Sequence, residues 1–277
     1  MKSFRLAIVS VAVLGLATVA FADRPAHCPI PKDGLVAYYP FNEDCKDHSG
    51  NGNHGQPYGG PTWARGPVGA ALQLDGVDDY VQIVPKSDVS KMGDFTVSVW
   101  TYMKGIKQQP GGRRDRQYIF DGHAQSATAP KSEIYRPGFV LAYDQQPTCQ
   151  EICTGYLFST KSPHVVQKRS AKVMGGWHHL VFVRKGFEVA TYLDGKQLDG
   201  PDASTGHTGP LNMNHHWFVG TFAGNNPNYT IRGNRFNYSF RGMLDELRIY
   251  SRALSAGEVE TIYGAEGKSL PQPAKRD

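Results

Sequence analysis

The sequence predicts an all-β chain, a sandwich or jelly roll with one short C-terminal helix, and three observations support this fold class. The 31 Gly and 18 Pro interrupt the 277 residues too often for long helices, although 40% hydrophobic residues suffice for a large core. Short runs with apolar residues at alternate positions, the pattern of half-buried strands, recur along the chain. Eleven such runs are predicted strands: 34–41, 71–74, 80–84, 95–102, 117–120, 138–143, 155–158, 178–184, 188–193, 216–220 and 242–250. Only one segment, near the C-terminus, carries the start signal of a helix.

The N-terminus has the parts of a secretory signal peptide. Lys2 and Arg5 precede the apolar run 6–16, and the small residues at positions 20 and 22 suit cleavage before Asp23. Residues 6–22 fall short of the ~20 residues that span a bilayer, and no later segment is apolar enough to cross one. We therefore expect a signal peptide at 1–22, a lead-in at 23–33, and a mature protein that is secreted or otherwise extracytoplasmic.

Four cysteines in an exported chain predict disulfide bonds. Cys28, Cys45, Cys149 and Cys153 allow three pairings, between which the sequence does not decide. The local arrangement Cys28–Cys45 and Cys149–Cys153 is preferred, because each bridge would close its own short loop. Zinc is the competing interpretation, but the region of the last two cysteines lacks a second Cys pair or a spaced His pair.

The predicted strand 95–102 has the clearest alternation. Its three apolar residues share one face, which we expect to be buried, and Trp100 and Tyr102 lie on the other. Both rings are candidate ligand-binding residues, since an aromatic surface packs against the apolar face of a sugar. The alternative is that the irregular insertion 104–137 covers them.

Turn and cap signals mark the C-terminal half. Asp194-Gly195 predicts a tight hairpin, because a type I′ turn needs positive φ at both central residues. Ser255 and Glu258 have capping-box spacing and predict the start of a short helix. The domain is expected to span 34–264, with a flexible tail at 265–277 that is poor in apolar residues.

Four motifs occur in an order typical of one family. They are residues 47–55 (DHSGNGNHG), 70–81 (AALQLDGVDDYV), 176–184 (GWHHLVFVR) with the hairpin 193–196, and 240–254 (FRGMLDELRIYSRAL). Together they resemble the laminin-G-like jelly-roll domains of the concanavalin A-like lectin and glucanase superfamily, over about residues 34–264. The resemblance implies a two-sheet antiparallel jelly-roll sandwich with one concave sheet. It says less about activity, because this fold carries lectins, adhesion modules, lyases and hydrolases.

The first motif supplies the oxygen ligands that calcium prefers. Asp47, Asn51 and Asn53 lie in a Gly-rich loop, and family members often carry a structural calcium. Asp245 is the expected distant ligand, because alternation along the strand 242–250 would place its carboxylate on the core-facing side, where a buried charge needs a cation or several donors. We therefore expect a structural calcium bound by these four residues.

Two further aspartates allow two interpretations. Asp75 and Asp78 of the second motif either take part in cation binding or complete a turn through side-chain hydrogen bonds to the backbone. The sequence favours neither interpretation.

The net charge bears on the kind of partner, and the spacing of the carboxylates bears on whether the chain is an enzyme. A formal charge of +5 is too small to indicate a nucleic-acid partner. Retaining glucanases of this fold need two carboxylates about 5–5.5 Å apart, and no Glu-x-Asp-x-x-Glu occurs. The sequence predicts a non-catalytic module that binds a glycan or an extracellular protein. The alternative is a polysaccharide lyase or glycoside hydrolase with an atypical site.

Overall fold

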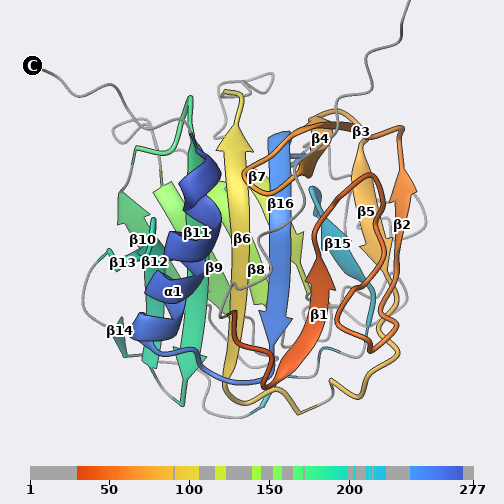
Figure 1. Cartoon of the computed structure of the whole chain (residues 1–277). Helices are drawn as coiled ribbons and strands as arrows, with labels where there is room; N and C mark the ends of the chain where they lie inside the picture. Colours follow the sequence, from red (N-terminus) through yellow and green to blue (C-terminus); the bar gives the residue numbers. More distant parts are fainter. Residues whose placement is uncertain are drawn as a thin grey trace, which may run out of the picture.

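The computed structural model is a sandwich of two antiparallel sheets with one helix on an outer face (Figure 1). It describes residues 30–89, 91–105, 116–122, 139–144, 152–157, 165–170, 172–186, 188–198, 202–203, 210–211, 213, 215–222 and 238–270. One sheet has nine strands, in the order β13 (Lys196–Gln197), β12 (Glu188–Leu193), β11 (Trp177–Lys185), β6 (Phe95–Met103), β16 (Arg241–Tyr250), β4 (Ala70–Asp75) and β3 (Thr62–Arg65), with β1 (Leu35–Tyr39) beside β16 and β14 (Asp202–Ala203) beside β12. The other has seven, in the order β10 (Val165–Ser170), β9 (Ile152–Leu157), β8 (Phe139–Asp144), β7 (Arg116–Asp121), β15 (Trp217–Val219), β5 (Tyr80–Ile83) and β2 (Gly55–Tyr58).

This arrangement confirms the predicted all-β, two-sheet jelly-roll sandwich with a C-terminal helix. Each of the eleven predicted runs contains or overlaps an observed strand. The main core lies between the sheets, and the predicted apolar face of β6 belongs to it, with Phe95, Val97 and Val99 at most 1% exposed. The opposite face of β6 therefore points out of the sandwich, toward the helix.

Strand β16 contains a bulge that overturns the predicted orientation of Asp245. The pairing with β6 shifts register between Asp245 and Arg248, and Glu246 has φ of 53°. Leu244 and Leu247 consequently both face the main core, although three positions separate them. Asp245 pairs with Trp100 of β6 and lies on the outer side of the sheet instead of the core-facing side, because the extra residue resets the alternation.

The hairpin and the helix start agree with the sequence prediction. Asp194 and Gly195 both have positive φ, at 52° and 78°. Helix α1 (Ala256–Glu266) begins with a capping box in which Ser255 accepts from the N–H of Glu258 and the Glu258 side chain accepts from the N–H of Ser255. Helix α1 continues to Glu266, and a 3₁₀ turn covers Gly267–Ser269, within the segment 265–277 that the sequence analysis assigned to the tail.

Several predictions fall outside the described residues. The signal peptide at 1–22, Cys28, Cys149 and the side chain of Cys153 belong to this group, so neither predicted disulfide is tested. Cys45 is 5% exposed, and burial raises the pKa of its thiol to about 12. The helical segments of the described part of the chain are too short or too polar to span a bilayer.

Candidate functional site

Trp100 is a structural residue, which corrects its prediction as a ligand-binding residue. Its ring is 0% exposed and lies between the outer face of the nine-stranded sheet and α1, which crosses that face in Figure 1. The ring packs on Tyr263 of α1 at 5.7 Å and on His179 at 5.2 Å, both as centroid distances. The C-terminal helix therefore covers the ring. Neither interpretation of Trp100 from the sequence, a ligand-binding ring or a ring under the insertion 104–137, predicted this contact with α1.

A buried network of charges holds the end of α1 on the sheet. The Glu266 carboxylate accepts a hydrogen bond from Trp100 Nε1 at 2.8 Å and pairs with the Arg248 guanidinium at 2.7 Å. Arg248 also pairs with Glu246, which accepts from the Tyr38 hydroxyl at 2.9 Å. Two carboxylates thus share one guanidinium, with all three side chains at most 2% exposed. Such a network fixes the helix and offers no access to a ligand.

Burial sets the protonation of this covered face. Desolvation is the main cause that raises the pKa of Glu266 to about 8, with Arg248 opposing the shift. Desolvation likewise lowers the pKa of His179 to about 3, so its imidazole is neutral at physiological pH. His179 contacts the Ser98 hydroxyl at 2.8 Å, and His178 contacts Asp194 at 2.8 Å. Both His are strand residues with structural partners.

The predicted calcium loop is held by its own hydrogen bonds. Asp47 Oδ1 accepts from the N–H groups of Tyr38 and Ser49 at 3.0 and 2.8 Å, and Oδ2 accepts from that of Asn53 at 2.9 Å. The amides of Asn51 and Asn53 each donate to backbone carbonyls of β1 at 2.9 Å. These side chains therefore close the loop onto β1, a role that needs no cation.

Asp245 accepts a hydrogen bond from a different part of the chain. Its Oδ2 accepts from the N–H of Val68 at 3.1 Å, and its partners include none of the residues that bind Asp47. Desolvation raises the pKa of Asp245 well above its usual range, with Glu246 as the next cause. Its Oδ1 is buried and has no hydrogen-bond partner within the described residues. Asp245 therefore retains one carboxylate oxygen that a cation could use.

Three acidic residues do converge elsewhere. Ligand oxygens of Asp75, Asp78 and Asp79 all lie within 4.8 Å of one another, the single such metal-competent group in the described part of the chain. Asp75 Oδ1 accepts from the N–H of Val77 at 2.6 Å, and the N–H of Asp75 donates to Asp79 at 2.9 Å. The Asp75 carboxylate therefore makes a side-chain-to-backbone hydrogen bond of the kind that the turn interpretation predicts.

Tyr102 lies at an open hollow of about 520 Å³ at the end of β6. Its ring meets Trp177 edge to face at 5.8 Å. Met174, which is 38% exposed, and Lys104 also line this hollow. The Lys104 ammonium donates to the Gln73 side chain at 2.9 Å. Of the two predicted aromatic residues, only Tyr102 can meet a ligand.

The outer face of the seven-stranded sheet carries a more developed aromatic surface. Val81 and Ile83 of β5 point into the main core, so Tyr80 and Gln82 point away from it. The register pairs Tyr80 with Tyr58 and Gln82 with Gln56 on the neighbouring strand β2. The Tyr58 and Tyr80 rings stack at 4.9 Å with an interplanar angle of 12°, and Tyr58 is 42% exposed.

Polar groups flank this stacked pair. Gln82 Nε2 donates to His216 Nδ1 at 2.8 Å, and burial lowers the pKa of His216, which keeps its ring a neutral acceptor. Gln82 and the exposed Gln56 lie two positions along their strands from the tyrosines, on the same face of the sheet, and Gln56 Nε2 donates to the backbone carbonyl of Pro57 at 3.3 Å. We name Tyr58, Tyr80, Gln56, Gln82 and His216 the tyrosine platform. Because β2 is the last strand of the sheet, one face of Tyr58 has no further strand beside it among the described residues.

The sequence contained a partial signal for the platform. The predicted strand 80–84 puts its apolar residues inward, which leaves Tyr80 and Gln82 on the outer face. Tyr58 was missed because the stretch 55–60 (GQPYGG) has no apolar alternation. Aromatic rings with adjacent planar amides can hold a ligand that has both an apolar face and hydroxyl groups.

Comparison with known proteins gives a family and a fold. The sequence model of the family described as "Concanavalin A-like lectin/glucanases superfamily" matches residues 75–260. No curated protein matches the chain. Among solved structures, domain 4 of AbnA, a GH43 extracellular arabinanase from Geobacillus stearothermophilus in complex with arabinotriose, is 20% identical with a TM-score of 0.57. That match covers 83% of this chain and 98% of the arabinanase domain.

Two toxin domains are similar in fold as well. The binding domain of Paraclostridial Mosquitocidal Protein 1 is 17% identical (TM-score 0.61), with 84% of this chain and 52% of that one covered. The ligand binding domain of botulinum neurotoxin serotype D, in complex with N-acetylneuraminic acid, is 10% identical (TM-score 0.61), with 84% and 51% covered. The chain thus spans about half the length of these two domains. At these identities the likeness establishes the fold alone.

Proposed function

Because the chain belongs to the concanavalin A-like lectin/glucanases superfamily, we propose that it is an exported, non-catalytic module that binds carbohydrate on the tyrosine platform. The observation that carries this proposal is the stacked pair Tyr58–Tyr80 with the amides of Gln56 and Gln82 beside it. A sugar ring would pack its apolar face on Tyr58, and its hydroxyl groups would bond to the amides.

The proposal draws further support from where the fold leaves room. The nine-stranded sheet carries α1 on its outer face, so Trp100 and its neighbours are closed to a ligand. The platform lies on the opposite layer, with exposed residues on β2 and half-buried residues on the neighbouring strand β5. Two of the similar structures hold a saccharide, arabinotriose in one and N-acetylneuraminic acid in the other. These ligands are sensible first probes.

A glycan array with three forms of the protein tests the proposal. We expect the wild type to bind at least one saccharide class, and Tyr58→Ala to lose that binding. Trp63→Ala is the matched control, because Trp63 is also an exposed aromatic residue, at 37%, on the last strand of the other sheet. Equal loss in both variants would contradict a specific platform. An array without hits would favour an extracellular protein as the partner.

The alternative function, a polysaccharide lyase or glycoside hydrolase with an atypical site, stays a prediction. Asp245 and Glu246 are adjacent acids, but Glu246 is engaged by Arg248 and Tyr38 at 1% exposure. A carboxylate in that position has no route to a substrate. Release of reducing ends or unsaturated products from a polysaccharide panel would establish an enzyme and overturn the non-catalytic assignment.

We also propose that any structural calcium binds at Asp245 and not in the loop of Asp47. The support is the buried Oδ1 of Asp245, which has no hydrogen-bond partner within the described residues, whereas both carboxylate oxygens of Asp47 accept backbone N–H groups. A buried carboxylate with an open oxygen is stabilised either by a cation or by protonation. Calcium would supply the cation as a hard ion that prefers oxygen ligands.

A further inference from the structure

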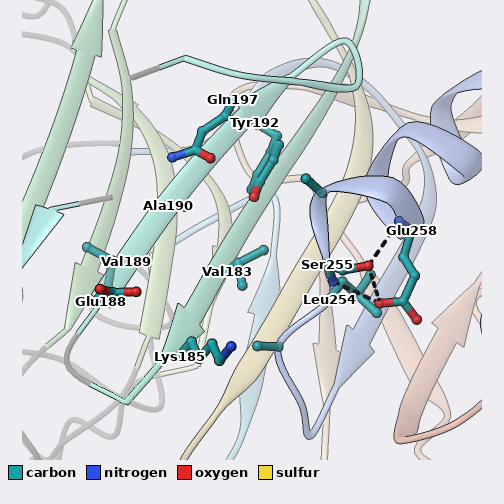
Figure 2. Close-up of a pocket in the computed structure, with 12 residues that line it drawn as sticks. Val183, Lys185, Glu188, Val189, Ala190, Tyr192, Gln197, Leu254, Ser255 and Glu258 are labelled. Carbon is teal, nitrogen blue, oxygen red and sulfur yellow. Dashed lines mark hydrogen bonds between the residues drawn. The ribbon is translucent and has the colours of Figure 1, made fainter. Parts of the chain in front are cut away.

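A groove of about 330 Å³ lies on the outer face of the nine-stranded sheet, between β11 and β12 on one side and the first turn of α1 on the other (Figure 2). Val183, Ala190 and Leu254 form its aliphatic floor, and all three belong to the cluster that packs α1 onto the sheet. We call it the helix-side groove. It is separate from the tyrosine platform, which lies on the other layer.

Tyr192 brings a polar atom to this floor. Its side chain is 6% exposed, and Figure 2 shows its hydroxyl pointing into the space that the labelled residues enclose. Within the described structure, the hydroxyl has no hydrogen-bond partner. Burial raises the pKa of Tyr192, so the hydroxyl is neutral and can donate one hydrogen bond and accept others. A hydroxyl placed in this way suits a polar atom of a ligand, with which it can exchange a hydrogen bond in place of water.

The rim adds polar groups that the fold itself does not use. Gln197 lies directly across from Tyr192 in the strand register, and Lys185 lies across from Glu188. In the described part of the chain, none of Gln197, Lys185 and Glu188 has a side-chain hydrogen bond or ion pair. Together with Tyr192 they supply a cation, an anion and two neutral groups that both donate and accept.

We propose that the helix-side groove is a second ligand site, which holds a neutral mono- or disaccharide. The rim gives no net preference for a charged ligand, because Lys185 and Glu188 lie opposite each other and their charges offset. A wholly apolar ligand is disfavoured because it would bury the Tyr192 hydroxyl without a partner. Each hydroxyl of a sugar both donates and accepts, which fits the mixed rim, and its carbon-bound faces fit the aliphatic floor. The groove volume lies at the small end of the ~300–1,000 Å³ typical of ligand pockets, which favours a short saccharide.

Backbone amide shifts of the full mature chain test this site, with glucose, galactose, arabinose, lactose and maltose as probes. We expect at least one probe to shift amides of β12 and of the first turn of α1. Tyr192→Phe removes only the hydroxyl and retains the ring that packs on the sheet. It should weaken this binding about five- to tenfold, the effect of one lost hydrogen bond. Gln197→Ala, at an exposed position, serves as a second variant that leaves the floor intact.

Tyr58→Ala separates this inference from the proposed function. Because Tyr58 lies on the other sheet, its substitution should leave the groove shifts unchanged. Shifts confined to β2 and β5 would overturn the groove and retain the platform. The inference is also overturned if no probe shifts the groove amides up to its solubility limit, or if Tyr192→Phe binds as tightly as the wild type.

Discussion

Substitution of Trp100 by Phe should destabilise the protein without touching a ligand site. The indole is 0% exposed, and its Nε1 donates to Glu266 at 2.8 Å. Phe keeps an aromatic ring between Tyr263 and His179, but removes this donor and leaves a small void. The lost hydrogen bond costs about 1–3 kcal/mol, according to the charge on Glu266. The void adds roughly 1 kcal/mol.

The expected total is therefore about 3 kcal/mol in the free energy of unfolding, measured by urea denaturation. For a domain of this size that corresponds to a fall in Tm of roughly 6–12 °C. Trp63→Phe is the matched control, because Trp63 is 37% exposed, and it should change the unfolding free energy by less than about 0.5 kcal/mol. Equal effects of the two substitutions would refute the assignment of Trp100 as the anchor of α1.

Three further predictions concern pH, cations and the hairpin. Burial raises the folded-state pKa of Glu266 from 4.5 to about 8, so its stabilising contribution is fully present below about pH 4.5 and is lost as the pH rises to about 8. The free energy of unfolding of the wild type, measured in urea, should therefore fall between about pH 4.5 and about pH 8, and Glu266→Gln should flatten that dependence. If calcium binds at Asp245, EDTA should lower the Tm of the wild type and leave that of Asp245→Asn unchanged, whereas an unchanged wild-type Tm would exclude the cation. Gly195→Ala should lower the free energy of unfolding in urea by about 1–2 kcal/mol, because Gly195 has φ of 78° and a Cβ there would lie 2.9 Å from Tyr263. Gly264→Ala is the control: this helix position has open space around it, so the substitution should be neutral or stabilising.

The fold was predictable because most strands bury one face. Each of the eleven alternating runs contains or overlaps an observed strand. The hairpin at Asp194-Gly195 and the capping box at Ser255 are also present in the structure. The strands β2 and β3 escaped prediction, since each is the last strand of its sheet and has mostly exposed or half-exposed residues. Without a buried face, a strand needs no apolar alternation.

The site was less predictable, because it depends on how distant segments meet. Alternation correctly placed Trp100 away from the main core, but a single strand does not reveal that α1, more than 150 residues later, covers it. The bulge at Glu246 reversed the side on which Asp245 lies, and one inserted residue leaves no hydrophobic signal. Tyr58 gains meaning only from its pairing with Tyr80.

On the proposed function, Tyr58 contributes directly to saccharide binding. The most direct test is titration calorimetry of the best saccharide from the array with the wild type, Tyr58→Ala and Trp63→Ala. We predict a Kd at least about tenfold higher for Tyr58→Ala, equivalent to ~1.4 kcal/mol, because the substitution removes the stacking surface and leaves the fold intact. Trp63→Ala should keep the wild-type Kd. An unchanged Kd for Tyr58→Ala would contradict the assignment of the tyrosine platform as the binding surface.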